Sequence, residues 1–187
     1  GALEAYLHAD LIEESNTWVL HRVAHCYRVL KQPDTALTYY RRLEQFRPDD
    51  LHIQLLIGHC YLELKQYDKA LNRYFKVELL DSDNRRAWRS VAWCAFLSRK
   101  FDVARKYYAR ILEDEPNAHD WLNAGHVELC LEENKKALLL YRSSMEKAGS
   151  FDDFRSMLAE DVEELQEAGV NTAILPVILD KMRYDLT

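Results

Sequence analysis

The sequence has 187 residues, of which 48% are hydrophobic and 30% are charged, and its formal net charge is −6. Five glycines and four prolines are too few for an all-β fold with many tight turns or for a flexible linker. No apolar run approaches the roughly 18 residues of a membrane-spanning helix. The chain has no basic excess, which argues against binding of nucleic acid through a charged surface. The composition is typical of a soluble globular protein.

An internal period of 34 residues extends through most of the chain. Four alanines lie 34 residues apart and a fifth follows after 33, at Ala2, Ala36, Ala70, Ala104 and Ala137. A tyrosine follows each of them by four residues, at Tyr6, Tyr40, Tyr74, Tyr108 and Tyr141. Another position is always small, at Ala24, Gly58, Ala92 and Gly125. A fixed period of this length predicts stacked helical hairpins, in which the small residue lets two antiparallel helices pack closely.

In chain order, residues 1–14 match the second helix of a hairpin whose first helix is missing, so we expect further repeats to precede them. Residues 15–148 predict four complete hairpins. Their apolar residues recur every three or four positions, and Asp, Asn and Pro, which cap or end helices, separate the runs. The expected helix pairs are 17–30 with 34–46, 51–64 with 67–80, 85–98 with 101–114, and 118–131 with 134–148.

The repeat pattern stops at Gly149, and residues 149–187 are predicted to form acidic capping helices. One helix is expected over 151–168, with Gly169 as its C-terminal cap, and another near 173–185 with Pro176 in or near its first turn. From residue 150 onward there are nine acidic and three basic residues, so this segment carries the whole net charge of −6. A polar end segment keeps a stack of repeats soluble.

These residues resemble the tetratricopeptide repeat family. The best matches are Leu-Lys-Gln-Tyr-Asp-Lys-Ala at 64–70 and Ile-Gly-His-Cys-Tyr at 57–61, and Trp88 and Trp121 fall where the family often has tryptophan. The resemblance covers residues 1 to about 148. It implies an all-α fold, a right-handed solenoid of antiparallel helix hairpins with capping helices at its C-terminal end. It also implies a scaffold or adaptor that binds a protein or peptide, rather than an enzyme.

In this family the first helices of the hairpins line a concave groove, so helical spacing predicts which side chains face a partner. The groove is rich in arginine, histidine and aromatic residues, which suit a peptide with carboxylates and an apolar anchor. The alternative is that some of these side chains pack between helices or pair with acids of neighbouring helices. The predicted partner-binding residues are His21, Arg22, His25, Arg28, His52, His59, Arg86, Arg89, Trp93, Phe96, Asn123 and His126.

Other functions have weaker support in the sequence. His21 and His25 are four residues apart on one helix face, but the stretch lacks the glutamate of a zincin motif. Histidines at the same repeat position lie on neighbouring helices, about 8–10 Å apart, too far to converge on zinc, so we expect no metal and no cofactor. No P-loop, G-x-S-x-G or H-E-x-x-H motif favours catalysis. A chaperone for a secreted substrate and a module that stacks single-stranded nucleic acid remain alternatives. In the chaperone-binding subgroup of the family, cationic and amide residues hold a C-terminal carboxylate; of the matching positions here, only Arg86 fits.

The cysteines are expected to be packing residues. Cys26, Cys60 and Cys94 share one position of the 34-residue repeat, and Cys130 lies apart from them. The sequence contains no Cys-x-x-Cys pair. Single cysteines fit a reducing compartment. We therefore expect a cytoplasmic protein that has no membrane contact.

Overall fold

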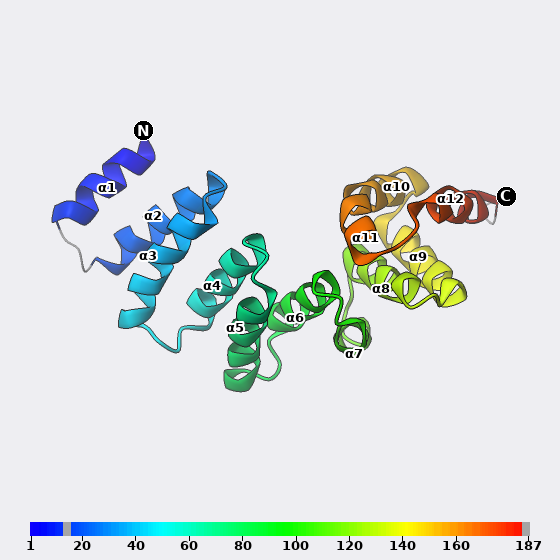
Figure 1. The fold of residues 1–187 in the computed structure, drawn as a ribbon, viewed down its shortest axis with the longest axis horizontal. Coiled ribbons are helices and arrows are strands. Elements are labelled where there is room, and N and C mark those ends of the chain that lie inside the picture. Colours follow the sequence, from blue (N-terminus) through cyan, green and yellow to red (C-terminus); the bar gives the residue numbers. More distant parts are fainter. Residues whose placement is uncertain (13–15, 185–187) are drawn as a thin grey trace. The chain divides into compact units, whose positions relative to one another are not determined.

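The computed structural model describes residues 1–12 and 16–184, and within these ranges it contains helices and no strand. The fold class predicted from the sequence, an all-α arrangement of helix hairpins, is confirmed. Figure 1 labels the helices. They are α1 (Ala2–Ile12), α2 (Thr17–Val29), α3 (Pro33–Phe46), α4 (Leu51–Glu63), α5 (Tyr67–Leu80), α6 (Arg85–Leu97), α7 (Phe101–Leu112), α8 (Ala118–Cys130), α9 (Asn134–Ala148), α10 (Phe151–Glu160), α11 (Val162–Ala168), the 3₁₀ helix η1 (Thr172–Ile174) and α12 (Leu175–Tyr184).

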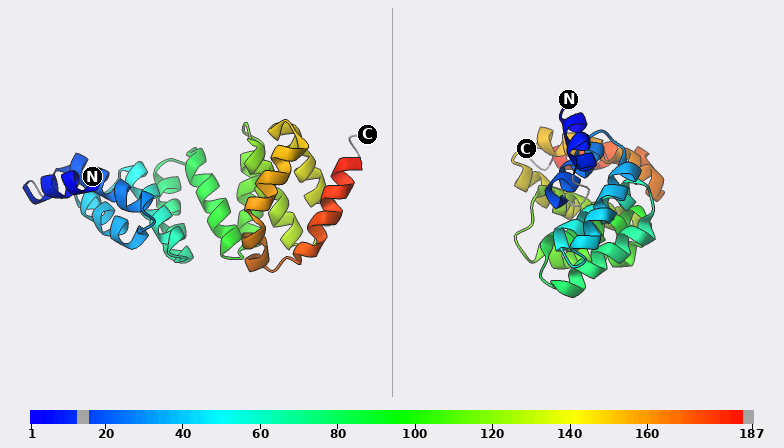
Figure 2. Two further views of the ribbon diagram at one scale, coloured as in Figure 1. Left: turned by 90° about the horizontal axis from the view of Figure 1, so that it is seen from above. Right: turned by 90° about the vertical axis from the view of Figure 1, so that its left-hand side faces the viewer.

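The chain forms two compact units, residues 1–87 and residues 88–187, and the boundary falls inside α6. In the first unit, α2 pairs with α3 and α4 pairs with α5, and α3 also packs on α4. In the second unit, α8 pairs with α9, and α7 packs on α8. Figure 2 shows these hairpins from two further sides. The division predicted from the sequence, at residues 14 and 148, separates repeats from flanking segments and stays a prediction.

The repeated tyrosines hold the hairpins together. Tyr40, Tyr74 and Tyr141 are fully buried, and Tyr108 is nearly so. The ring of Tyr74 lies against Gly58, where an added Cβ would be 2.3 Å from Cε1 of Tyr74. Tyr141 lies in the same way against Gly125, at 2.4 Å. The small position of the first helix therefore receives the tyrosine of the second helix, which explains why both recur with the same period.

The turn inside each hairpin uses a left-handed residue that is not glycine. Lys31, Lys65, Arg99 and Glu132 have φ between 55° and 61°. After each of them the chain closes a Schellman motif. In the second hairpin, the N–H of Gln66 donates to the carbonyl of Tyr61 at 2.8 Å, and the N–H of Lys65 donates to Leu62 at 2.9 Å. These bonds satisfy carbonyls at the end of the first helix, so the hairpin turns tightly without a glycine at the left-handed position.

The first helices of three hairpins have side-chain caps at their N-termini. The side chains of Asn16 and Asp50 accept hydrogen bonds from the first backbone N–H groups of α2 and α4. Asn117 and Asp120 form a reciprocal capping box at the start of α8. Each cap replaces hydrogen bonds that the first turn of a helix lacks. These three helices begin at residues 17, 51 and 118, as predicted, whereas α3 begins at Pro33, one residue before its predicted start.

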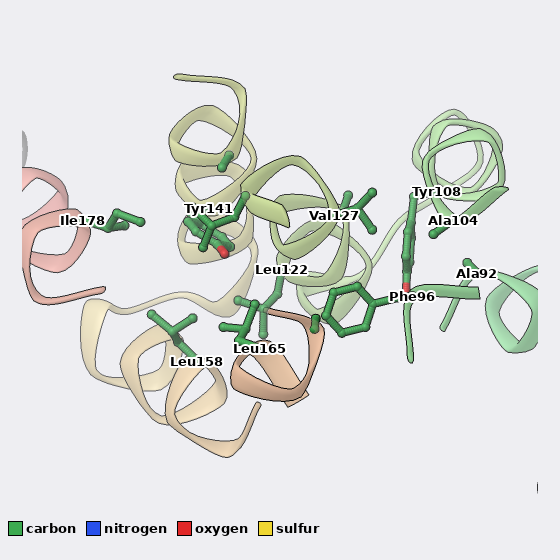
Figure 3. Close-up of a cluster of buried hydrophobic side chains, with 14 of the residues drawn as sticks. Ala92, Phe96, Ala104, Tyr108, Leu122, Val127, Tyr141, Leu158, Leu165 and Ile178 are labelled. Atoms are coloured by element: carbon green, nitrogen blue, oxygen red, sulfur yellow. The ribbon is translucent and has the colours of Figure 1, made fainter. Parts of the chain in front are cut away.

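The C-terminal segment packs back on the last hairpin. The helix expected over 151–168 is broken at Asp161, whose backbone lies at φ −98° and ψ 9°, and it continues as α11. Gly169 ends α11 in the left-handed conformation, and Pro176 lies in the first turn of α12. The helices α10, α11 and α12 contact α8 or α9. Figure 3 shows Leu165 of α11 beside Leu122 of α8, near the ring of Phe96.

No helix in the described part of the chain is long and apolar enough to span a membrane.

Candidate functional site

A pocket between α2 and α4 in the first unit contains three of the side chains predicted to bind a partner, those of His21, Arg22 and His52. Its volume is about 380 Å³. The N-terminal turns of α2 and α4 and the C-terminal end of α3 form its walls, because antiparallel packing brings these three helix ends to one edge. We call it the α2–α4 pocket; it is lined by Thr17, Trp18, His21, Arg22, Leu43, Arg47, Asp50, His52 and Ile53.

Trp18 gives the pocket an exposed apolar surface. Its side chain is 56% exposed, although Tyr6 of α1 packs edge-on against it with 5.6 Å between ring centroids. The guanidinium of Arg22 lies 5.2 Å from the centre of the indole. This cation–π contact places a positive charge beside the apolar face of the indole ring. The pair can therefore bind a ligand that carries both a negative charge and an apolar group.

His21 and His52 stack across the two helices, with ring centroids 5.8 Å apart and planes inclined by 29°. The pKa of His21 is lowered, first by burial and then by repulsion from His52, His25 and Arg22, against a weaker opposite effect of Asp50. The His21 imidazole is therefore neutral at pH 7 and can donate or accept a hydrogen bond. Its cationic form becomes more populated as the pH falls.

The acid in this pocket is already engaged. Asp50 accepts hydrogen bonds from the backbone N–H groups of His52 and Ile53 at 3.0 and 3.2 Å, and its other oxygen lies 3.9 Å from Arg47. Among residues 1–12 and 16–184, no carboxylate forms an ion pair with Arg22. The pocket therefore keeps positive charge that the described part of the chain does not neutralise.

The second unit has an ion pair at the corresponding place. Arg89 and Asp120 lie 68 residues after His21 and His52, two repeat lengths along the sequence. The guanidinium of Arg89 donates two hydrogen bonds of 2.8 Å to the carboxylate of Asp120. These hydrogen bonds raise the pKa of Arg89. The same pair of positions thus carries two stacked imidazoles in one unit and a closed Arg–Asp pair in the other.

The comparisons with known proteins agree with this repeat arrangement. Residues 30–94 match the model of the tetratricopeptide repeat family. This segment is similar to tetratricopeptide repeats. The family resemblance found in the sequence is thereby confirmed, and the matched segment includes α3, α4, α5 and most of α6. No curated protein matches the chain.

Several solved structures share the fold at low sequence identity. A tetratricopeptide repeat protein from Parabacteroides merdae has a TM-score of 0.70 and 17% identity, covering 97% of this chain and 77% of its own. The thermophilic TPR protein TTC0263 of Thermus thermophilus has a TM-score of 0.68 and 18% identity, covering 85% and 88%. YrrB, described as a TPR protein with an unusual peptide-binding site, has a TM-score of 0.64 and 15% identity, covering 97% and 99%.

Of the predicted partner-binding residues, only some are available on the surface of the repeats. Arg22, His25, His52 and Arg86 are exposed. The half-buried ones are His21, Arg28, His59, Arg89, Trp93 and Asn123. Several of these already have partners within their unit. Arg89 pairs with Asp120, the ring of Trp93 stacks on Phe96 at 5.1 Å, and Asn123 hydrogen-bonds Tyr108.

The expectation that Phe96 and His126 face a groove is corrected by the structure, since both are fully buried. Nδ1 of His126 lies 2.8 Å from the hydroxyl of Tyr141, and Nε2 lies 3.2 Å from a carboxylate oxygen of Asp161. The segment from α10 to α11 covers this part of α8. Helical spacing predicts which face of a repeat is inward, but it does not show that a segment outside the repeat covers that face.

His59 is also engaged inside its hairpin. Its Nδ1 lies 3.0 Å from the hydroxyl of Tyr74, and burial, with smaller contributions from Arg28 and His52, lowers its pKa to about 4. His59 therefore remains neutral wherever the protein is near neutral pH, and it contributes no charge to a binding site.

Sequence reasoning missed Arg47 and Asp50, which it assigned to the break between two hairpins. The antiparallel order of the helices was the available signal, because it returns the end of α3 to the start of α2 and α4. For the metal alternative, the described residues hold no group of three or more His, Cys, Asp or Glu side chains placed to bind a metal ion. None of the four cysteines, all within the described residues, forms a disulfide, and Cys60 and Cys94 are buried.

Proposed function

We propose that this chain is a protein-binding scaffold, without catalytic activity of its own, that holds an acidic peptide segment with an apolar anchor in the α2–α4 pocket. The observation that carries the proposal is the pairing of exposed Trp18 with Arg22, beside the stacked imidazoles of His21 and His52. A carboxylate of the ligand pairs with Arg22 or Arg47, and a leucine or phenylalanine packs on the indole.

The physical basis is the imbalance of charge in the pocket. Arg22 is exposed and near Trp18, while the carboxylate of Asp50 serves as the cap of α4. An incoming carboxylate can therefore pair with cations that are not already bound to a buried acid. Arg89, in contrast, is bound to buried Asp120. The fold-level likeness to YrrB, whose description names a peptide-binding site, supports a peptide as ligand.

The test uses the full chain and a fluorescein-labelled peptide pool in which a leucine or phenylalanine is flanked by aspartate and glutamate. Fluorescence anisotropy gives the Kd. We expect Arg22→Glu and Trp18→Ala each to raise the Kd by about tenfold or more, since both remove a contact at the centre of the site.

Arg41→Glu is the matched control, because Arg41 is an exposed arginine of α3 outside the pocket. It makes the same change in net charge. If Arg41→Glu weakens binding as much as Arg22→Glu, the attraction is a property of the whole surface and the proposed site is wrong. If the Kd of the pool is unchanged in Trp18→Ala, the ligand does not use an apolar anchor on the indole, and that part of the proposal is wrong.

A further inference from the structure

A second pocket lies in the other unit, between the second helices of two hairpins. Its volume is about 280 Å³. Tyr108 and Leu112 of α7, Ala124 of α8 and Leu140 of α9 form an apolar floor and walls, with Ala109 and Leu139 at the rim. We call it the α7–α9 slot. It has no residue in common with the α2–α4 pocket.

The slot exists because small residues stand where two helices face each other. Ala109 on α7 and Ala124 on α8 are too short to fill the space beside Leu140. At the rim, Leu139 is 60% exposed. A single exposed leucine is ordinary on a protein surface, but this one extends the apolar lining of a cavity outward and so widens the surface available to a partner.

One wall of the slot is fixed by a buried acid. Glu128 is 8% exposed, and its carboxylate accepts two hydrogen bonds from Arg105, at 2.8 and 2.6 Å. The guanidinium thus spans the gap between α7 and α8 and prevents the slot from closing on that side. Opposite it, the exposed side chain of Lys136 lies 4.0 Å from Glu133. This is a weak surface contact, and a carboxylate of a partner can replace it.

The two helices that flank the slot are strongly basic. Together α7 and α9 contain seven basic and two acidic residues, a net charge of +5. Their counterparts in the first unit, α3 and α5, contain five basic and four acidic residues, a net charge of +1. Of the basic residues of α7 and α9, Arg105 and Lys136 line the slot, and the exposed side chains of Lys106, Lys135 and Lys147 lie on the same two helices. This charge favours an acidic partner.

We propose that the α7–α9 slot binds an acidic amphipathic helix of a partner protein, which inserts a leucine or phenylalanine side chain between α7 and α9 and places glutamates or aspartates along both flanking helices. The cavity is slightly smaller than the roughly 300–1,000 Å³ of typical small-molecule sites, which suits one anchor side chain. Amphipathic helices place such anchors at i, i+3, i+4 and i+7. The site is separate from the proposed function of the α2–α4 pocket.

The test uses the full chain carrying Arg22→Glu, which removes the acidic-peptide site proposed in the α2–α4 pocket, and two fluorescein-labelled helical peptides. One has leucines at i, i+3, i+4 and i+7 and glutamates on its other face, and the second has serines in place of the leucines. In anisotropy titrations we expect only the leucine peptide to bind. Ala109→Trp, which fills the slot, and Leu139→Glu, which repels the acidic helix, should each weaken binding by about tenfold or more. Both residues are exposed, so both variants should fold, as circular dichroism will show.

A matched control shows whether binding depends on this slot. Leu79→Glu changes a leucine of α5 that is 86% exposed and should leave binding unchanged. Equal binding of the serine peptide overturns the proposal, because the attraction is then purely electrostatic. Binding that survives both slot variants also overturns it. The proposal is also overturned if the leucine peptide does not bind while phosphatidylserine vesicles bind to the chain in a way that requires Leu139.

Discussion

The ring of Tyr74 occupies the space above Gly58 so fully that a single methyl group at residue 58 would lie 2.3 Å from Cε1 of the tyrosine. Tyr74 cannot easily move, because it is fully buried and its hydroxyl is hydrogen-bonded to His59. The contact fixes the distance between α4 and α5.

Gly58→Ala should therefore destabilise the protein. Alanine favours the helix by about 1 kcal/mol over glycine, but overpacking of this kind costs about 1–3 kcal/mol, so we expect a net loss of about 1 kcal/mol in unfolding free energy. Urea denaturation followed by circular dichroism measures it. Asn72→Ala, at an exposed position of α5, is the control and should not destabilise. Equal stability of Gly58→Ala and the wild type would show that Tyr74 can shift.

Lys65→Gly should stabilise the protein, which is the opposite of the usual effect of glycine. Lys65 has φ of 55°, a conformation that costs an L-residue about 1 kcal/mol but suits glycine. The Schellman hydrogen bonds use only the backbone, so the substitution keeps them. We expect a gain of roughly 0.5–1 kcal/mol in urea denaturation. Lys69→Gly, inside α5, should lose about as much, and a loss in both variants would contradict the prediction.

Acid should weaken the first unit through His59. Its pKa is lowered from 6.5 to about 4 in the folded protein by burial, so the unfolded chain binds more protons than the folded one between these values. The contribution of neutral His59 is therefore complete above pH 6.5 and is lost as the pH falls toward about 4. We expect the wild type to lose about 2 kcal/mol by about pH 5 from this group.

Unfolding free energies measured at several pH values check this sign. His59→Gln should flatten the decline, whereas His119→Gln, at an exposed position, should leave it unchanged. A decline of the same steepness in His59→Gln would assign the acid sensitivity to other groups.

Peptide binding in the α2–α4 pocket should respond to pH in the other direction. Binding of a carboxylate favours the protonated form of His21, whose pKa is lowered in the free protein, so binding takes up a proton. We expect affinity for the acidic peptide pool to rise between about pH 8 and about pH 5.5. Calorimetry in buffers of different ionisation enthalpy measures the proton uptake. Flat affinity over this range, or an unchanged rise in His21→Gln, contradicts the prediction.

Arg89→Ala should cost stability, because it leaves the buried carboxylate of Asp120 without its two charged hydrogen bonds. We expect a loss of about 1–3 kcal/mol in unfolding free energy. Arg86→Ala, at an exposed position of the same helix, should change stability by less than about 0.5 kcal/mol. Comparable effects of the two substitutions in urea denaturation would show that the Arg89–Asp120 pair is not a stabilising contact.

The hairpins could be predicted from the sequence because their contacts repeat. Tyr74 meets Gly58 and Tyr141 meets Gly125 at one fixed offset, so both the helix ends and the buried tyrosines follow from the period. The site could be predicted only in part. His126 is covered by Asp161 and its neighbours, a contact outside the repeat that no periodicity encodes. Arg47 joins the α2–α4 pocket through the antiparallel return of α3, and its position in a break between helices gives no sign of this.

The correspondence between His21–His52 and Arg89–Asp120 shows that one pair of positions in this fold can serve two purposes. Where the pair is an arginine and an aspartate, the two neighbouring first helices are tied to each other and their charges cancel. Where the pair is two histidines, the helices are joined only by stacked imidazoles, and the polar edges of the rings can bind a ligand. The double substitution His21→Arg and His52→Asp should therefore abolish binding in the α2–α4 pocket. It would place between α2 and α4 the same kind of ion pair that Arg89 and Asp120 form in the second unit.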